Sequence, residues 1–584
     1  MHPTDSPDHR ATSALISVHG SPARPAIVWS ACLAALVTTW LLAAWFHRPI
    51  DVGAEATTPK VKSVSFAPFR RGQSPLQEIF PSPAEIAADV ALLSSRTESL
   101  RTYASRHGLE VLPALAREHG LTITQGAWLG WGAADNEREI EALIASANAH
   151  PDVVTRVIVG NEVLLRGELS AAELIAQIEK VKRAVAQPVS YADVWSMYLK
   201  HPEIIAAVDF ITIHILPYWE DEPVAIDAAA HHLEKITAAV AAEARALGST
   251  KPIFIGESGW PSRGRQRGLA VPSVVNAARY TRAIVDVAAQ RGFDYNIVEA
   301  FNQPWKAALE GTVGAHWGLF SADRQPLYPL SGRVVEVSHW LERLLLVSAL
   351  LIMSVGAFHT RLALLPAHHT TLAVSVMSIL ALALVYGADH GWHTSYTPVE
   401  TLTAAIGIVL AAIIAALLVR RVLDLLSSCT TPPRIARALR LAYLGVTCFA
   451  LYRTHLLAHH GRYVSFPIDH LTVPVLGLVG LLAARLLVTG RVSRLDLHLS
   501  NLLGTPTHPL DRWLGWTVAI AIAALISGET YAFFEARDLR SVYPTWSEAL
   551  PVALRHALGN SELLTWVLLL GCLGRVLVPV PARR

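Results

Sequence analysis

The sequence predicts an α/β fold, a (β/α)8 TIM barrel, joined to an α-helical polytopic transmembrane region. Short β-branched or aromatic runs alternate with helical patterns over residues 60–333, which is typical of parallel βα units. Apolar runs of bilayer length dominate residues 341–580. The composition agrees, because only 16% of the 584 residues are charged, against roughly 25% in soluble proteins.

The chain starts with a polar tail, residues 1–25, followed by an apolar run over residues 26–46. Arg10 and Arg24 precede this run, so a signal peptide cleaved near Ala54-Glu55-Ala56 is one interpretation. The run is longer than a typical signal h-region, which favours an uncleaved transmembrane anchor. In both cases the segment that follows is translocated.

Eight runs between residues 60 and 333 are predicted strands, and about 270 residues is a usual size for a TIM barrel. The predicted strands are Val61–Phe69, Ser99–Tyr103, Leu121–Trp128, Val153–Val159, Val189–Val194, Phe210–Ile215, Pro252–Ile255 and Tyr295–Phe301. Helical patterns between them are Pro83–Ser95, Asn136–Ala149, Ala171–Ala186, Ala225–Leu247 and Pro272–Arg291.

Seven further apolar runs predict a membrane domain over residues 341–580. They are residues 341–358, 370–387, 401–419, 438–457, 471–489, 513–533 and 562–580. With the anchor they make eight spans, so the lipid bilayer is a partner and both termini lie on one side. Arginines gather in the loops on the side of the termini, which predicts a cytoplasmic tail and places residues 60–333 in the periplasm of an inner-membrane protein. Arg537, Arg540 and Arg555 on the outer side fit this rule least well.

Several classes of function are disfavoured. The net charge is +2 and no strongly basic stretch occurs, so no nucleic-acid partner is expected. Four cysteines are present, none between residues 47 and 337, and no zinc-ligand spacing appears. We therefore expect no metal and no cofactor.

Two glutamates stand at the ends of predicted strands. Glu162 ends the fourth, in Val159-Gly160-Asn161-Glu162, and Glu257 ends the seventh, in Gly256-Glu257-Ser258-Gly259-Trp260. Active sites of TIM barrels lie at the face formed by the carboxyl ends of the strands. Glycosidic cleavage uses two carboxyl groups, which lie about 5–5.5 Å apart in retaining enzymes. Glu162 is the predicted acid and base, and Glu257 the predicted nucleophile.

These segments resemble glycoside hydrolase family 17, the β-1,3-glucanases and glucanosyltransferases. Val159–Val163 resembles the acid/base motif and Glu257–Ser262 the nucleophile motif. Three further segments resemble the second strand, the eighth strand and the closing segment of the family: Leu100–Tyr103, Phe301–Lys306 and Gly318–Phe320. The resemblance implies that Arg101 supports the nucleophile.

The resemblance and the strand-end positions together suggest a set of substrate-binding residues. They are Asn161, Tyr218, Trp260, Trp305, Lys306, Glu299, Trp195, Arg101 and Tyr103. The aromatic members are expected to stack on sugar rings or to belong to the core, since both uses are common for large rings. Gln303 stands where many relatives have Glu, which suggests altered subsite chemistry. Asp193 and His214 are expected to bond sugar hydroxyls or to orient their neighbours.

Family 17 barrels joined to many membrane spans resemble the bacterial membrane-bound β-(1,3)/(1,6)-glucan synthases. This resemblance implies a retaining enzyme that cleaves β-1,3-glucan through a covalent intermediate and transfers the chain to a sugar acceptor, with β-1,6 linkage as one outcome. An endo-β-1,3-glucanase is the alternative, and a non-catalytic glucan-binding or export component is the second alternative. A β-glucan is the expected substrate, and a separate glucan synthase is a candidate partner.

Overall fold

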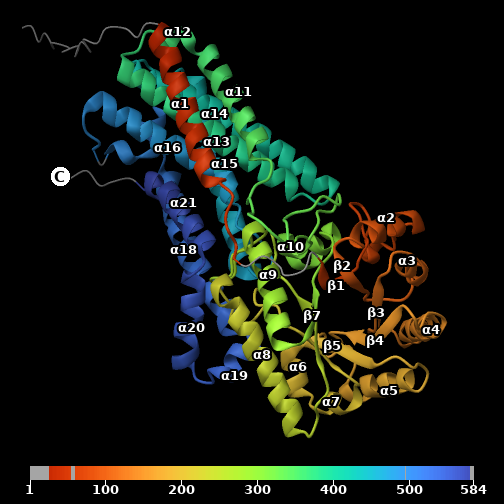
Figure 1. The fold of residues 1–584 in the computed structure, drawn as a ribbon. Helices are drawn as coiled ribbons and strands as arrows, with labels where there is room; N and C mark the ends of the chain where they lie inside the picture. Colours follow the sequence, from red (N-terminus) through yellow and green to blue (C-terminus); the bar gives the residue numbers. More distant parts are fainter. Residues whose placement is uncertain (1–24, 54–59, 494, 579–584) are drawn as a thin grey trace, which may run out of the picture.

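The structure, a computed structural model, describes residues 25–53, 60–493 and 495–578. A barrel of strands and helices lies beside a bundle of long apolar helices (Figure 1). Most of the predicted tail and the candidate cleavage site at Ala54-Glu55-Ala56 lie outside the described residues.

Eight parallel strands close into a barrel in the order of the sequence, β1 to β8. Their bounds are β1 Val61–Ser65, β2 Thr97–Arg101, β3 Thr122–Ala127, β4 Val154–Asn161, β5 Val189–Val194, β6 Ile211–His214, β7 Ile253–Ser258 and β8 Asp294–Ile297. The ring closes through Val64 of β1, which pairs with Ile297 of β8. The predicted (β/α)8 fold is therefore confirmed, and the carboxyl ends of β4 and β7 meet at one mouth.

Helices cover the outside of the barrel. The α-helices are α2 Pro83–Leu93, α3 Leu112–Glu118, α4 Ala133–Ala149, α5 Ala171–Lys182, α6 Trp195–Lys200, α7 Glu203–Ala207, α8 Ile226–Ala246, α9 Val274–Arg291 and α10 Ala307–Gly314. Local sequence explains where two of them begin. Ser82 caps α2 and Ser170 caps α5, each in a capping box with the glutamate three residues later. Aliphatic side chains of strands and helices then form one continuous core.

The second half of the chain, together with α1 near the N-terminus, is helical. Within the described residues, seven helices are long and apolar enough to cross a membrane: α1 Pro25–Phe46, α11 Trp340–Ala357, α13 Ala367–His393, α14 Pro398–Leu426, α15 Pro433–His460, α16 Ile468–Thr489 and α18 Pro509–Phe534. An eighth span requires α20 Trp546–Leu558 and α21 Ser561–Leu577 together, and these two meet at 70°. Short helices connect them: α12 His359–Leu362, α17 Leu499–Leu503 and α19 Arg537–Val542.

The barrel contacts alternate ends of these helices. The ring of His316 bonds the Tyr396 hydroxyl before α14, at 2.8 Å. Asp538, which follows α18, pairs with Lys200 of the barrel at 2.9 Å, so α19 lies beside the barrel (Figure 1). In α18, the carboxylate of Glu529 forms a buried ion pair with Arg265, which follows β7. Glu529, an ionisable group near the end of an apolar run, thus docks the barrel.

Candidate active site

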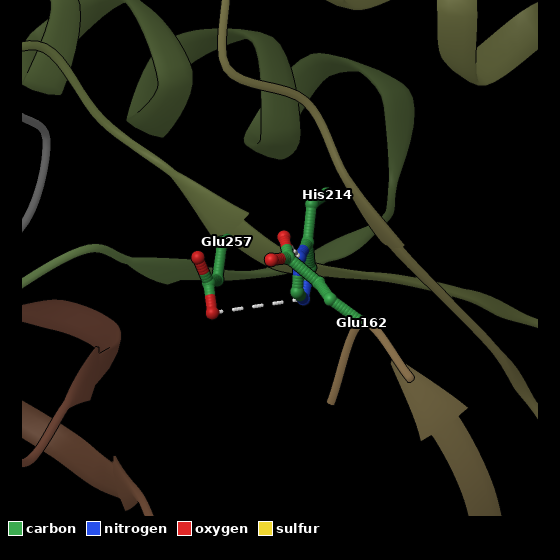
Figure 2. A group of neighbouring side chains, drawn as sticks. All are labelled: Glu162, His214 and Glu257. Atoms are coloured by element: carbon green, nitrogen blue, oxygen red, sulfur yellow. Dashed lines mark hydrogen bonds and ion pairs between the residues drawn. The ribbon is translucent and has the colours of Figure 1, made fainter. Parts of the chain in front are cut away.

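The two predicted catalytic glutamates converge at the mouth of the barrel. Each has a carboxylate oxygen within 4.8 Å of the other and of a ring nitrogen of His214 (Figure 2). This spacing fits a retaining pair, because inverting enzymes separate their carboxyl groups by about 6.5–9.5 Å. The closed barrel produces this convergence, since it brings the ends of β4 and β7 to the same face.

The backbone at the end of β4 sets the direction of Glu162. Glu162 has φ 53°, in the left-handed region that non-glycine residues seldom occupy, and it follows Gly160 with φ 86°. Backbone strain of this kind gathers at functional sites, where the surrounding structure holds it. The side chain is about one quarter exposed and so remains accessible to a substrate.

His214, at the end of β6, lies between the two carboxylates. Its Nδ1 is 2.8 Å from Oε1 of Glu162, and its Nε2 is 3.7 Å from Oε1 of Glu257 (Figure 2). The imidazole is buried and both of its ring nitrogens face the carboxylates, so it can orient the acid/base. Of the two roles predicted for His214, the geometry favours the orienting one.

Arg101 holds the predicted nucleophile. Its Nη1 donates to Oε1 of Glu257 at 3.0 Å, and its Nη2 donates to Oδ1 of Asn161 at 2.6 Å. Burial by itself raises the pKa of Glu257, but attraction to His214, Arg101 and Lys306 outweighs it and lowers the pKa below the usual glutamate value. Glu257 is therefore held as the carboxylate that a nucleophile must be.

A second ion pair lies behind the first. Glu299 is fully buried and bonds Lys306 Nζ at 3.0 Å. Burial raises the pKa of Glu299 to about 7, although Lys306 opposes this rise. Asp193, at the end of β5, is also buried, and burial together with the charge of Glu162 raises its pKa to about 6. Glu299 and Asp193 thus arrange the charge around the pair without being exposed to substrate themselves.

One cavity of about 660 Å³ contains both glutamates. Of the predicted binding residues, Trp195 and Lys306 line it. The indole nitrogen of Trp195 is fixed by Glu220 at 3.1 Å. Glu310, which also lines the cavity, was missed by the sequence analysis, and only its short distance along the chain from Lys306 could have indicated it.

Other predicted binding residues lie farther back. Asn161 is buried and bonded to Arg101. The Tyr103 hydroxyl donates to Ser65 Oγ at 2.9 Å, and its ring lies against Arg101. Trp305 is partly exposed, and its Nε1 donates to Gln303 at 2.9 Å. These contacts orient the side chains of Asn161, Tyr103 and Trp305. Sugar binding by these three residues stays a prediction.

Tyr218 and Trp260 are not where a cleft-lining role requires them. Their exposed fractions are 0% and 2%, and neither lines the cavity. The Tyr218 hydroxyl donates to the Arg265 carbonyl, and the Trp260 indole donates to that of Val271. Of the two uses expected for these rings, the structure favours the core: their apolar area is used in a buried aromatic cluster.

Gln303 also has a structural explanation. It is fully buried, and its Nε2 donates to the carbonyl of Ala67 at 2.5 Å while its Oε1 accepts from Trp305. An ionised glutamate could not make the first of these bonds. The expected change of subsite chemistry is thus not located at Gln303, which is not among the residues that line the cavity.

Glu162, His214 and Glu257 are also the kind of trio that binds a metal, since their ligand atoms lie within 4.8 Å of one another. The guanidinium of Arg101 is already 3.0 Å from Glu257 and would repel a second cation. The donor set is therefore explained better by acid–base chemistry than by metal binding. The absence of a metal and of a cofactor stays a prediction.

Comparison with known proteins agrees with this geometry. Residues 63–318 match the family described as the BtgE/BtgC glycoside hydrolase domain. The glucan 1,3-β-glucosidase BGL2 of Candida albicans is 30% identical over 266 residues, which are 41% of this chain and 84% of the relative. This chain belongs to glycoside hydrolase family 17.

Two further relatives match the same half of the chain. The glucan 1,3-β-glucosidase of Arthroderma benhamiae is 28% identical over 42% of this chain and 83% of its own length. The β-1,3-glucanosyltransferase of Rhizomucor miehei is 29% identical over 47% of this chain and 98% of its own, with a TM-score of 0.41. With its family match over residues 63–318, the chain is a glycoside hydrolase-like enzyme, and that match ends before α11 begins.

Proposed function

We propose that this family 17 enzyme cleaves β-1,3-glucan with retention and transfers the released chain to a sugar acceptor. The observation that carries the proposal is the pair of Glu162 and Glu257, with oxygens within 4.8 Å of each other in one cavity. Relatives named glucan 1,3-β-glucosidase and β-1,3-glucanosyltransferase support the choice of substrate.

The geometry supports a double displacement. A carboxylate oxygen of Glu257 attacks the anomeric carbon, and the bond to the leaving oxygen breaks as Glu162 gives that oxygen its proton. The product of this step is a glycosyl ester on Glu257. Glu162, now ionised, takes a proton from the acceptor hydroxyl, whose oxygen displaces Glu257 from the anomeric carbon. Water in place of the acceptor would give hydrolysis.

Product analysis separates the two outcomes. The full-length enzyme in detergent, incubated with β-1,3-linked oligosaccharides, should yield products longer than the substrate, seen by mass spectrometry, and linkage analysis names the new bond. Glu257→Gln should yield none. Shorter products alone would make the enzyme a glucanase, and no turnover by the wild type would contradict both activities and leave a glucan-binding role.

We also propose that the enzyme spans an inner membrane eight times, with the barrel in the periplasm, where a separate glucan synthase could supply its substrate. Two observations support this topology. The barrel contacts alternate ends of the apolar helices, before α14 and beyond α15 and α18. Arg537 and Arg540 lie on the same side of the apolar helices as the barrel, because α19 contacts the barrel through the pair of Lys200 and Asp538.

Cysteine labelling tests this topology. Cys429 is exposed between α14 and α15, where we expect cytoplasm, and the other cysteines lie within the apolar helices α1, α15 and α21. A charged maleimide should leave Cys429 unlabelled in sealed spheroplasts and label it after permeabilisation. Ser95→Cys, at an exposed position of the barrel, should react in both. Labelling of Cys429 in sealed spheroplasts would mean that the orientation in the membrane is the reverse of the proposed one.

A further inference from the structure

The cavity that holds the catalytic pair has walls from both halves of the chain. The barrel contributes the glutamates and the segments that follow β5, β6 and β8. The helical part of the chain from α11 to α21, here called the membrane half, contributes further residues to the cavity. Among them are Arg462 and Tyr463, from the connection between α15 and α16, and Arg537 and Asp538, at the start of α19. The family match ends at residue 318, so these wall residues are an addition to the family 17 barrel.

Close backbone packing holds the connection between α15 and α16 against the barrel. Gly311 in α10 has φ 68°, and a Cβ there would lie 2.0 Å from the carbonyl oxygen of Tyr463. Arg265 Nη1 donates to the carbonyl of Val464 at 2.8 Å. A hydroxyl pair, Ser465 and Thr312, adds a contact at 3.3 Å. The connection is therefore a fixed part of the cavity wall.

The start of α19 is held equally well. The carboxylate of Asp538 pairs with Lys200 Nζ at 2.9 Å, and its backbone N–H donates to Oδ2 of Asp221 at 2.7 Å. Lys200 and Asp221 follow β5 and β6, and both line the cavity. Membrane-half residues thus bond to barrel segments that line the cavity.

The chemistry of this wall suits a carbohydrate. Tyr463 is 44% exposed and packs edge-on against Trp219, with ring centroids 5.8 Å apart. The guanidinium of Arg462 lies 5.6 Å from the Trp219 ring. Aromatic rings offer apolar faces to sugar rings, and guanidinium groups offer several donors to hydroxyls. Arg537 adds a second guanidinium to the same cavity.

The position of the acid/base shows which part of the substrate meets this wall. Glu162 protonates the leaving oxygen and later deprotonates the acceptor, so both occupy the space next to Glu162. The cavity includes Glu162 and Leu165 and continues past Trp195 to the membrane half. We propose that Arg462, Tyr463 and Arg537 form the acceptor arm of the glucan site. This inference rests on the proposed transferase function.

The test separates donor cleavage from acceptor binding. The full chain in detergent is given an aryl β-laminaribioside as donor, whose small leaving group does not need the arm, and laminaritriose as acceptor. Release of the aryl group reports formation of the glycosyl-enzyme, and chromatography reports transfer. In the double variant Arg462→Ala/Tyr463→Ala, the acceptor concentration for half-maximal transfer should rise about tenfold, whereas aryl release in the first turnover should change much less.

A control variant makes the result specific. Trp392→Ala removes an exposed aromatic ring at the end of α13 that does not line the cavity, and it should behave like wild type. An unchanged acceptor requirement in the double variant would overturn the acceptor arm, as would an equal loss of aryl release and transfer. Aryl release without transfer by the wild type would overturn the transferase proposal and the arm with it.

Discussion

An enzyme with Glu257→Ala should form no glycosyl-enzyme and lose about 10⁴-fold or more of its kcat on β-1,3-glucan. The reason is that Glu257 supplies the attacking oxygen, which Arg101 holds in place at 3.0 Å. Added azide should enter the space left by the side chain and attack the anomeric carbon once. A single displacement on a β-linked aryl donor inverts the configuration, so the expected product is the α-glycosyl azide, identified by NMR.

The matched variant is Glu162→Ala, which removes the acid/base and keeps the nucleophile. An activated aryl donor needs no acid to leave, so the glycosyl-enzyme should still form, and azide should displace Glu257 in a second inversion. The product should then be the β-glycosyl azide. Exchange of the two stereochemical outcomes would mean that the roles of the glutamates are reversed. Glu141→Gln, exposed on α4, should leave the rate unchanged.

Arg101→Met should lower kcat/KM by about 10²–10³-fold and move the acidic limb of the pH–rate profile upward by about 1–2 pH units. Arg101 is 1% exposed, and its guanidinium is among the charges that lower the pKa of Glu257. Without that cation, burial raises the pKa of the nucleophile, so a higher pH is needed to ionise it. Rates measured from pH 3 to pH 8 would show the shift.

Arg101→Lys separates charge from geometry. It keeps a cation near Glu257 but cannot bond Glu257 and Asn161 in the same forked arrangement. The acidic limb should return toward that of the wild type while kcat/KM stays low. If Arg101→Met lowered the rate with no movement of the limb, Arg101 would act on folding and not on the ionisation of the nucleophile.

The barrel and its catalytic pair could be predicted because their signals are local. Each strand is a short β-branched run, and the order of the strands in a closed parallel barrel is their order in the sequence. Glu162 and Glu257 end β4 and β7, so the topology alone brings them to one mouth. The residues between Glu162 and Glu257 therefore did not have to be interpreted to predict that the two carboxylates meet.

The binding aromatics were harder to predict, because a ring at a strand end has two uses with the same sequence signature. Trp195 lines the cavity, whereas Tyr218 and Trp260 are buried in an aromatic cluster. Which use is realised depends on neighbours such as Tyr280 and Trp317, which fill the space around Tyr218 and Trp260. That space is created only when β6, β7 and β8 are assembled.

The sequence by itself determined the fold class, the catalytic pair and the apolar helices, since each depends on residue type at short spacing. Only the tertiary structure decided that the membrane half completes the cavity. Nothing in the sequence around Arg462 indicated that it would lie by Trp219. That contact joins segments far apart in the chain, and it exists because close packing at Gly311 and the buried pair of Arg265 and Glu529 hold the two halves together.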